Sequence, residues 1–289
     1  MSIEPSREAI EKAYSLANPC RLCPRLCEVD RPDDEKGYCG IGDTPLVANA
    51  GPHYGEESCL VGRGGSGTIF MSGCNLLCEF CQNASISHGA EGRPADPAEI
   101  ATMMLSLQRR GCENINFVTP SHVVPWLMDA VRQARMDELN VPIVYNSGGY
   151  DRVETLQLLE GTVDIYMPDA KFWDPDSGKR YCDAADYPDR MRESLKEMHR
   201  QVGDLTVVHG VARSGLLVRH LVMPEDVAGS KEILDFLAEE VSEDTAVNVM
   251  DQYRPCYRAS EYPEIARRPT SEEYSEVRNH ARELGLRLV

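Results

Sequence analysis

The chain has 289 residues, of which 42% are hydrophobic and 27% charged, a composition that excludes disordered and collagen-like proteins. Its formal net charge of −17 at pH 7 predicts a surface that repels nucleic-acid phosphates and anionic lipids. No apolar run is long enough to span a membrane, and the first residues lack the pattern of a signal peptide. We therefore expect a cytoplasmic protein with no nucleic-acid or membrane partner.

Residues 1–65 are rich in Cys, Gly and Pro and show one short helical pattern, near residues 8–16. In a reducing compartment, clustered thiols bind metal more often than they form disulfides. Four thiols have the spacing of a closed metal site: Cys20, Cys23, Cys27 and Cys39. Four thiolates complete either a zinc site or a [4Fe-4S] cluster, and the spacing favours neither Zn²⁺ nor a second iron-sulfur cluster. We expect a small N-terminal metal-binding lobe in which the metal is structural or, alternatively, relays electrons or binds substrate.

From residue 66 onward, short apolar runs alternate with amphipathic segments, which is the pattern of strand-helix units around a parallel sheet. The predicted strands are residues 68–72, 114–118, 142–146, 163–167, 216–223 and 246–250. Six strand-helix units predict an α/β fold, namely a partial (β/α)6 TIM-like barrel over residues 66–289. Its ligands should lie at the carboxyl ends of the strands.

Three helix starts are predicted from capping residues followed by Glu at the third position after them, and these are Asp96, Asp151 and Thr270. Apolar residues recur at helical spacing behind two predicted helix starts: Ile100, Met103, Met104 and Leu107, then Val124, Leu127, Met128 and Val131. These two stripes predict helices that face the core rather than a cofactor.

Directly after the first predicted strand, Cys74, Cys78 and Cys81 have the spacing CxxxCxxC on one short loop. Three thiolates can ligate three corners of a [4Fe-4S] cluster, which leaves one iron open to a non-protein ligand. A zinc knuckle is the alternative interpretation of this loop. The open iron would be a site of chemistry, so we predict that this loop is the reactive centre.

This loop, with Phe80 just before its last Cys, resembles the signature of the radical S-adenosylmethionine (SAM) superfamily. The resemblance implies that the amino and carboxylate groups of SAM chelate the open iron and that Phe80 packs near the adenine. It further implies that the reduced cluster cleaves SAM to methionine and a 5'-deoxyadenosyl radical, which abstracts hydrogen from a substrate.

Two downstream segments are similar to those of pyruvate formate-lyase activating enzymes. Residues 163–171 resemble the strand of that family that ends in Asp-x-Lys, which implies that Asp169 and Lys171 lie beside SAM. Residues 217–224 resemble a strand that carries an Arg and ends in Pro, so Arg219 is the candidate for the SAM ribose or carboxylate. An ion pair at the barrel mouth is the structural alternative for these three residues.

The chain departs from the superfamily where a Gly-Gly-Glu-Pro segment usually receives the SAM amino group, since it contains Thr119-Pro120-Ser121 there. Thr119, Ser121, Asn146 and Ser147 are the candidate substitutes, although Ser121 also suits a helix cap. This replacement and the segments 53–57, 65–70 and 250–255 look like the PflX-like subgroup, in which Cys59 is a deviation.

The resemblance therefore implies an anaerobic radical SAM oxidoreductase that acts on a protein or peptide, as enzymes that generate glycyl radicals do. Reduced flavodoxin or ferredoxin is the implied electron donor. A radical SAM enzyme acting on a small molecule and a non-catalytic iron-sulfur or zinc scaffold are the alternatives. The isolated Cys112, Cys182 and Cys256 are expected to be buried and inert. Cys256 is the candidate exception, because it follows the end of the sixth predicted strand, where a barrel mouth would present it to substrate. His53 and His122 are the histidines to test first by mutation.

Overall fold

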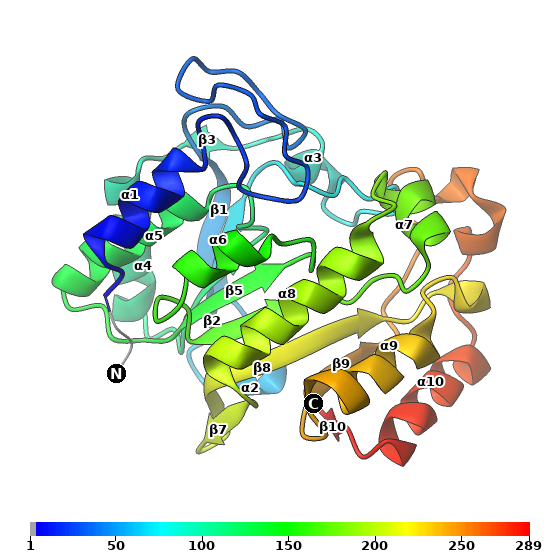
Figure 1. Ribbon diagram of the computed structural model, residues 1–289. Helices are drawn as coiled ribbons and strands as arrows, with labels where there is room; N and C mark the ends of the chain where they lie inside the picture. Colours follow the sequence, from blue (N-terminus) through cyan, green and yellow to red (C-terminus); the bar gives the residue numbers. More distant parts are fainter. Residues whose placement is uncertain (1–3) are drawn as a thin grey trace.

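Short runs of β-branched and apolar residues form one curved, mostly parallel sheet in the computed structural model, which describes residues 4–289 (Figure 1). The strands are β1 (Leu46–His53), β2 (Ser66–Met71), β3 (Arg93–Pro94), β4 (Ile115–Val118), β5 (Ile143–Ser147), β6 (Ile165–Pro168), β7 (Thr206–Val208), β8 (Val211–Leu221), β9 (Ala246–Met250) and β10 (Arg287–Leu288). Their order in the sheet is β10-β9-β8-β6-β5-β4-β2-β1-β3, with β7 paired to β8.

The six predicted strands correspond to β2, β4, β5, β6, β8 and β9, and each pairs in parallel with its neighbours in this set. The prediction of a partial TIM-like barrel is thus confirmed. Four strands were not predicted. Among them, β1 pairs antiparallel with β2, and β7 forms a hairpin with β8. The hairpin turns at His209 and Gly210, whose φ angles of 53° and 82° are the positive values that tight hairpins require.

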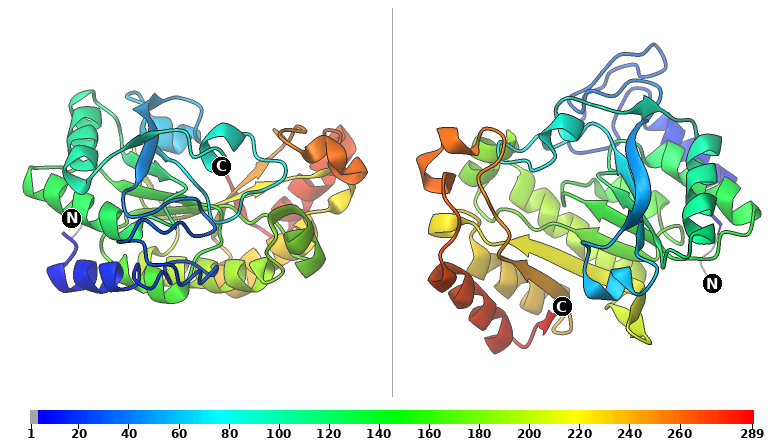
Figure 2. Two further views of the ribbon diagram at one scale, coloured as in Figure 1. Left: turned by 90° about the horizontal axis from the view of Figure 1, so that it is seen from above. Right: turned by 180° about the vertical axis from the view of Figure 1, so that it is seen from behind.

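Helices pack against the sheet, most of them on its outer side and α2 at one end of the barrel (Figures 1 and 2). They are α1 (Arg7–Ser15), α2 (Ser58–Val61), α3 (Ala84–Ser87), α4 (Pro97–Arg109), α5 (Val124–Met136), α6 (Val153–Leu158), α7 (Pro175–Cys182), α8 (Tyr187–Val202), α9 (Ser230–Phe236) and α10 (Ser271–Glu283). Four shorter helical turns follow β8 and β9: η1 (Pro224–Asp226), η2 (Leu237–Val241), η3 (Ala259–Glu261) and η4 (Pro263–Ile265). The N-terminal α1 contacts both α5 and α6, so the first segment of the chain contributes a helix to this outer layer.

Two of the three predicted caps are confirmed. Asp96 and Thr270 form capping boxes with the Glu that lies three residues later in each helix. The prediction for Asp151 is wrong, because α6 begins at Val153 with no side-chain cap. The Asp151 carboxylate instead accepts hydrogen bonds from the hydroxyls of Tyr145 at 2.9 Å and Ser147 at 2.6 Å, donors that a buried carboxylate takes in preference to a helix end.

The predicted apolar stripes face the core. Every member of both stripes is buried except Met103, which is partly buried. Inside the barrel, α2 closes the end at which the parallel strands begin. Its Cys59 and Leu60 pack with Val144, Ile165 and Leu217, and the Leu60 carbonyl accepts a hydrogen bond of 2.8 Å from the Asn114 amide. The carboxyl ends of the strands therefore form the end that remains for ligands.

Candidate active site

The loop that follows β2 carries the three cysteines of the CxxxCxxC pattern. Its backbone is shaped by two positive φ angles, 79° at Gly73 and 50° at Leu77. The Cys74 sulfur accepts the Leu76 backbone N–H at 3.3 Å, and the Cys81 sulfur lies 3.1 Å from the Ser87 hydroxyl. Cys78 is buried, whereas Cys74 and Cys81 are partly buried. The three sulfurs thus come from one loop at the carboxyl end of one strand.

Burial raises the pKa of the Cys74 thiol to about 12 and raises the pKa of Cys81 as well. A hydrogen bond with Cys182, together with burial, raises the pKa of Cys78. A metal that binds here must therefore displace protons from all three thiols. In the described residues 4–289, no three His, Cys, Asp or Glu side chains form a group that could hold a single metal ion. The fit of this loop to a cluster rests on its thiolate donors, which are the ligands that iron-sulfur clusters take.

Four of the predicted site residues meet in one charged network at the carboxyl ends of β5, β6 and β8. Asp169 accepts hydrogen bonds from Lys171 at 2.6 Å and from Arg219 at 3.0 Å, and Arg219 also donates to the Asn146 side chain at 2.8 Å. Burial favours the neutral form of Asp169, but the two cations lower its pKa below the usual value. Asp169 in turn raises the pKa of Lys171, so the pair stays ionised.

The network is joined to the cysteine loop. Gly148, which follows β5, lies between them: a side chain at this position would meet Leu76 Cδ1 at 2.7 Å and Lys171 Cε at 3.7 Å. The cysteine loop and the Asp169 network therefore line one region of the barrel.

Two carboxylates that were not predicted extend the network into the barrel interior. Glu56 pairs with Arg219 at 3.4 Å and with His53 at 3.3 Å, while Glu57 accepts a hydrogen bond of 2.9 Å from Asn248. Glu57 Oε2 is buried without a hydrogen-bond partner. Glu56 and Glu57 are adjacent in the sequence and directly precede the four-residue helix α2. Nothing in this local sequence predicts that their side chains point into the barrel. His53 thus acts as a partner of Glu56.

The candidates that replace the Gly-Gly-Glu-Pro segment occupy different places. Thr119 directly follows β4 with φ 59° and donates its backbone N–H to the Asn146 carbonyl at 2.8 Å. The Ser147 hydroxyl donates its hydrogen bond to Asp151. Burial raises the pKa of Asp151, and hydrogen bonds from Ser121 and Ser147 oppose this rise. Of these candidates, Asn146 is the one whose side chain lies in the Asp169 network.

Phe80 is buried in an aromatic cluster. Its ring lies edge-on to Phe172, with 5.8 Å between the ring centroids, and 6.1 Å from Tyr253. His122 is a core histidine: it is 2% exposed, and its Nε2 lies 2.8 Å from the Ser72 carbonyl. Burial and the nearby Arg31 lower its pKa to about 4, so its ring is neutral at pH 7.

The four N-terminal cysteines lie in a folded set of turns. Backbone hydrogen bonds join Cys20 to residues 28 and 29, and the Cys27 sulfur accepts the Tyr38 N–H at 3.3 Å. A side chain at Gly37 would meet the Cys27 sulfur at 3.0 Å, so Gly is required at this approach. Burial and the other three thiols raise the pKa of Cys23. The backbone at Cys20 and Cys27 is thus ordered by these turns, and a metal site formed by all four cysteines stays a prediction.

The two cysteine groups touch. The Cys39 carbonyl lies 2.5 Å from the position that a side-chain carbon on Gly73 would occupy. Arg25, which lies between Cys23 and Cys27, donates to the Asn75 carbonyl at 2.8 Å and to the Cys182 carbonyl at 2.7 Å. Arg25 thus links the N-terminal turns to the CxxxCxxC loop and to the end of α7. The sequence gives no signal of this role, because both partners lie far from Arg25 in the chain.

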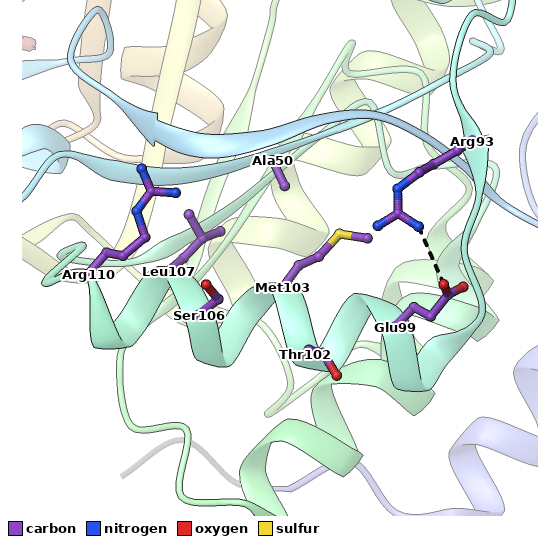
Figure 3. Close-up of a pocket in the computed structure, with 8 residues that line it drawn as sticks. All are labelled: Ala50, Arg93, Glu99, Thr102, Met103, Ser106, Leu107 and Arg110. Atoms are coloured by element: carbon purple, nitrogen blue, oxygen red, sulfur yellow. Dashed lines mark hydrogen bonds and ion pairs between the residues drawn. The ribbon is translucent and has the colours of Figure 1, made fainter.

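A groove of approximately 350 Å³ lies elsewhere, between β1 and α4 (Figure 3). Met103, Leu107 and Ala50 line it, and at one end Arg93 pairs with Glu99. It contains none of the cysteines and none of the residues of the Asp169 network. The groove is therefore separate from the candidate active site.

Comparison with known families identifies the fold and the loop. The family profile described as "Radical SAM superfamily" matches residues 68–237, which is more than half of the chain and includes all three cysteines of the loop. The chain belongs to the radical SAM superfamily. Membership supports an enzyme that uses a [4Fe-4S] cluster and SAM, and the three thiols of the loop are suitable ligands for the cluster.

A protein similar in sequence is "Uncharacterized protein MJ0674" of Methanocaldococcus jannaschii, with 34% identity over 97% of this chain and 79% of that protein. A radical SAM methyltransferase from Sphaerobacter thermophilus is similar in structure, with a TM-score of 0.53 and 14% identity over 77% of this chain. The match spans 65% of that methyltransferase. At this identity the likeness shows the shared radical SAM fold alone. Within residues 4–289, no helix is long and apolar enough to cross a membrane.

Proposed function

We propose that this radical SAM enzyme abstracts hydrogen from a protein or peptide, in the manner of the activating enzymes and of the PflX-like subgroup. The observation that carries the chemical part of the proposal is the three-thiol loop at the carboxyl end of β2, which adjoins the Asp169 network. When bound, the cluster and SAM supply a one-electron cleavage that yields a carbon radical. Reduced flavodoxin or ferredoxin is the proposed electron donor.

The network residues are proposed to bind and orient SAM. Arg219 presents a planar guanidinium that suits carboxylate or ribose oxygens, and Asp169 holds it from one side. Lys171 remains charged because Asp169 raises its pKa, so it offers a cation close to Cys78. The Asn146 side chain, which lies in the Asp169 network, and the backbone at Thr119, which follows β4, are the proposed partners of the SAM amino group.

The chemical part is tested by the products of SAM. Anaerobically reconstituted protein is expected to release 5'-deoxyadenosine when dithionite and SAM are added, and Cys78→Ala is expected to abolish the release. Cys112→Ala is the matched control, because Cys112 is equally buried but lies outside both cysteine groups. Failure of the wild-type protein to release 5'-deoxyadenosine while its iron content and absorbance show an intact cluster would overturn the proposal.

The substrate class is supported by the sequence of the strands. Residues 163–171 and 217–224 resemble those of activating enzymes, and the network residues that these segments carry meet in space. A small-molecule substrate is the alternative. The source organism is grown on deuterated glycine, and its extracted proteins are incubated with the reduced enzyme and SAM. If the enzyme abstracts hydrogen from a glycine residue of a protein, deuterium will appear in 5'-deoxyadenosine. Transfer from the low-molecular-weight filtrate alone would favour the small-molecule alternative.

A second metal centre is proposed at Cys20, Cys23, Cys27 and Cys39. Its support is the spacing of the four cysteines in the sequence and the backbone N–H that the Cys27 sulfur accepts at 3.3 Å. Metal analysis of the triple variant in which Cys74, Cys78 and Cys81 are all replaced by Ala separates the two chemistries. About four irons per chain in this variant would indicate a second cluster, whereas one zinc would indicate a closed tetrahedral site.

A further inference from the structure

Cys182 lies against a cysteine of the CxxxCxxC loop. Its sulfur is 3.3 Å from the Cys78 sulfur, with Cys182 as the donor, and the side chains of both residues are buried. The sequence places Cys182 more than 100 residues from this loop and predicts an inert thiol there. The structure confirms that the thiol is buried but places it on a proposed cluster ligand.

Three contacts hold the end of α7, and with it Cys182, against the loop. The Glu79 N–H donates to the Tyr181 carbonyl at 2.9 Å, so the residues next to Cys78 and Cys182 share one backbone hydrogen bond. Arg25 donates to the carbonyls of Cys182 and Asp183 at 2.7 and 2.5 Å. Because the same guanidinium also binds the Asn75 carbonyl, it fixes the helix end relative to the loop.

We infer that Cys182 is a positioning residue that donates an S–H hydrogen bond to the Cys78 sulfur and thereby makes the cluster easier to reduce. This inference rests on the proposed cluster at Cys74, Cys78 and Cys81. Reduction adds negative charge that is shared by the iron and its sulfur ligands, so a donor aimed at one sulfur stabilises the reduced state. Cys182 is not proposed as a ligand, because the loop alone supplies one thiolate for each of three irons.

The test is a redox titration of the reconstituted protein followed by electron paramagnetic resonance. The signal that changes on addition of SAM identifies the catalytic cluster if a second cluster is present. We expect Cys182→Ala to shift the midpoint potential of that signal to a lower value, with iron content unchanged. Cys182→Ser, which keeps a donor of nearly the same size, is expected to restore most of the shift, and Cys112→Ala to cause none.

An unchanged potential in Cys182→Ala would overturn the inference, and so would a loss of iron, since that would make Cys182 a ligand. If Cys182→Ala does not fold, Cys182→Val removes the donor while filling the space, and the same two outcomes apply. The inference and the proposed function fail differently. If the triple variant of the loop retains the SAM-responsive signal, the proposed cluster site is wrong, whereas an intact signal with an unmoved potential rejects the role of Cys182 alone.

Discussion

At the scale of single residues, the end of β4 carries an unusual backbone. Thr119 has φ 59°, a left-handed conformation that its branched side chain disfavours. Such residues persist where the surroundings impose them, and here the Thr119 N–H is bound to the Asn146 carbonyl beside the Asp169 network.

We expect Thr119→Gly to stabilise the fold by about 1 kcal/mol, because strain of roughly 1–2 kcal/mol is relieved and the added chain entropy of Gly offsets part of it. The free energy of unfolding in urea measures this effect. If the Thr119 hydroxyl contacts SAM, the same variant will bind SAM more weakly, whereas Thr119→Ser will not. Destabilisation by Thr119→Gly would show that side-chain packing outweighs the backbone strain.

At the scale of elements, the sequence predicts best where a local signal and the tertiary contacts agree. The caps at Asp96 and Thr270 act within their own helices, so they are correctly predicted. Asp151 carries the same local signal, but Tyr145 and Ser147 compete for its carboxylate, and no local pattern reports these donors. Cys182 and Glu57 escape prediction for a different reason, since their partners Cys78 and Asn248 lie far away in the chain.

The capping box of α4 gives a prediction at this scale. Asp96→Ala removes the side chain that accepts the Glu99 N–H at 2.8 Å, and we expect a loss of about 1 kcal/mol in the free energy of unfolding. Thr270→Ala at the start of α10 is expected to show a loss of similar size. Because α4 lies outside the candidate site, release of 5'-deoxyadenosine by folded Asp96→Ala should be unchanged. A loss of that activity would contradict the separation of α4 from the site.

At the scale of the whole molecule, the parallel sheet could be predicted because alternating strand and helix patterns recur over most of the chain. The N-terminal segment could be predicted only in part. The spacing of its cysteines predicts a metal site. The apolar run of β1, however, is short and contains Gly51 and Pro52, which argue against a strand. Pairing with β2 along its length overrides this weak local preference.

The stability of the whole fold should depend on pH through His122. Its pKa of about 4 lies below the value of about 6.5 expected when the chain is unfolded, so the unfolded chain binds more protons between these values. The stabilisation is present above pH 6.5 and is lost as the pH falls, by roughly 2 kcal/mol at pH 5 from this residue.

His122→Asn, which removes the titratable ring, is expected to lose about 2 kcal/mol less stability than the wild-type protein between pH 7.5 and pH 5. Urea unfolding at the two pH values measures the difference. His209→Asn, at an exposed position in the turn between β7 and β8, should behave as the wild-type protein does. Equal pH dependence in the wild-type protein and His122→Asn would show that His122 is protonated without cost in the folded state.

The contact between Cys39 and Gly73 has a consequence for how the enzyme matures. Because no side chain fits between the two backbones, the final shapes of the N-terminal turns and of the loop after β2 depend on each other. Loading of the proposed N-terminal centre should then promote loading of the proposed cluster. A protein starved of the metal proposed for the N-terminal turns is therefore expected to assemble its cluster slowly.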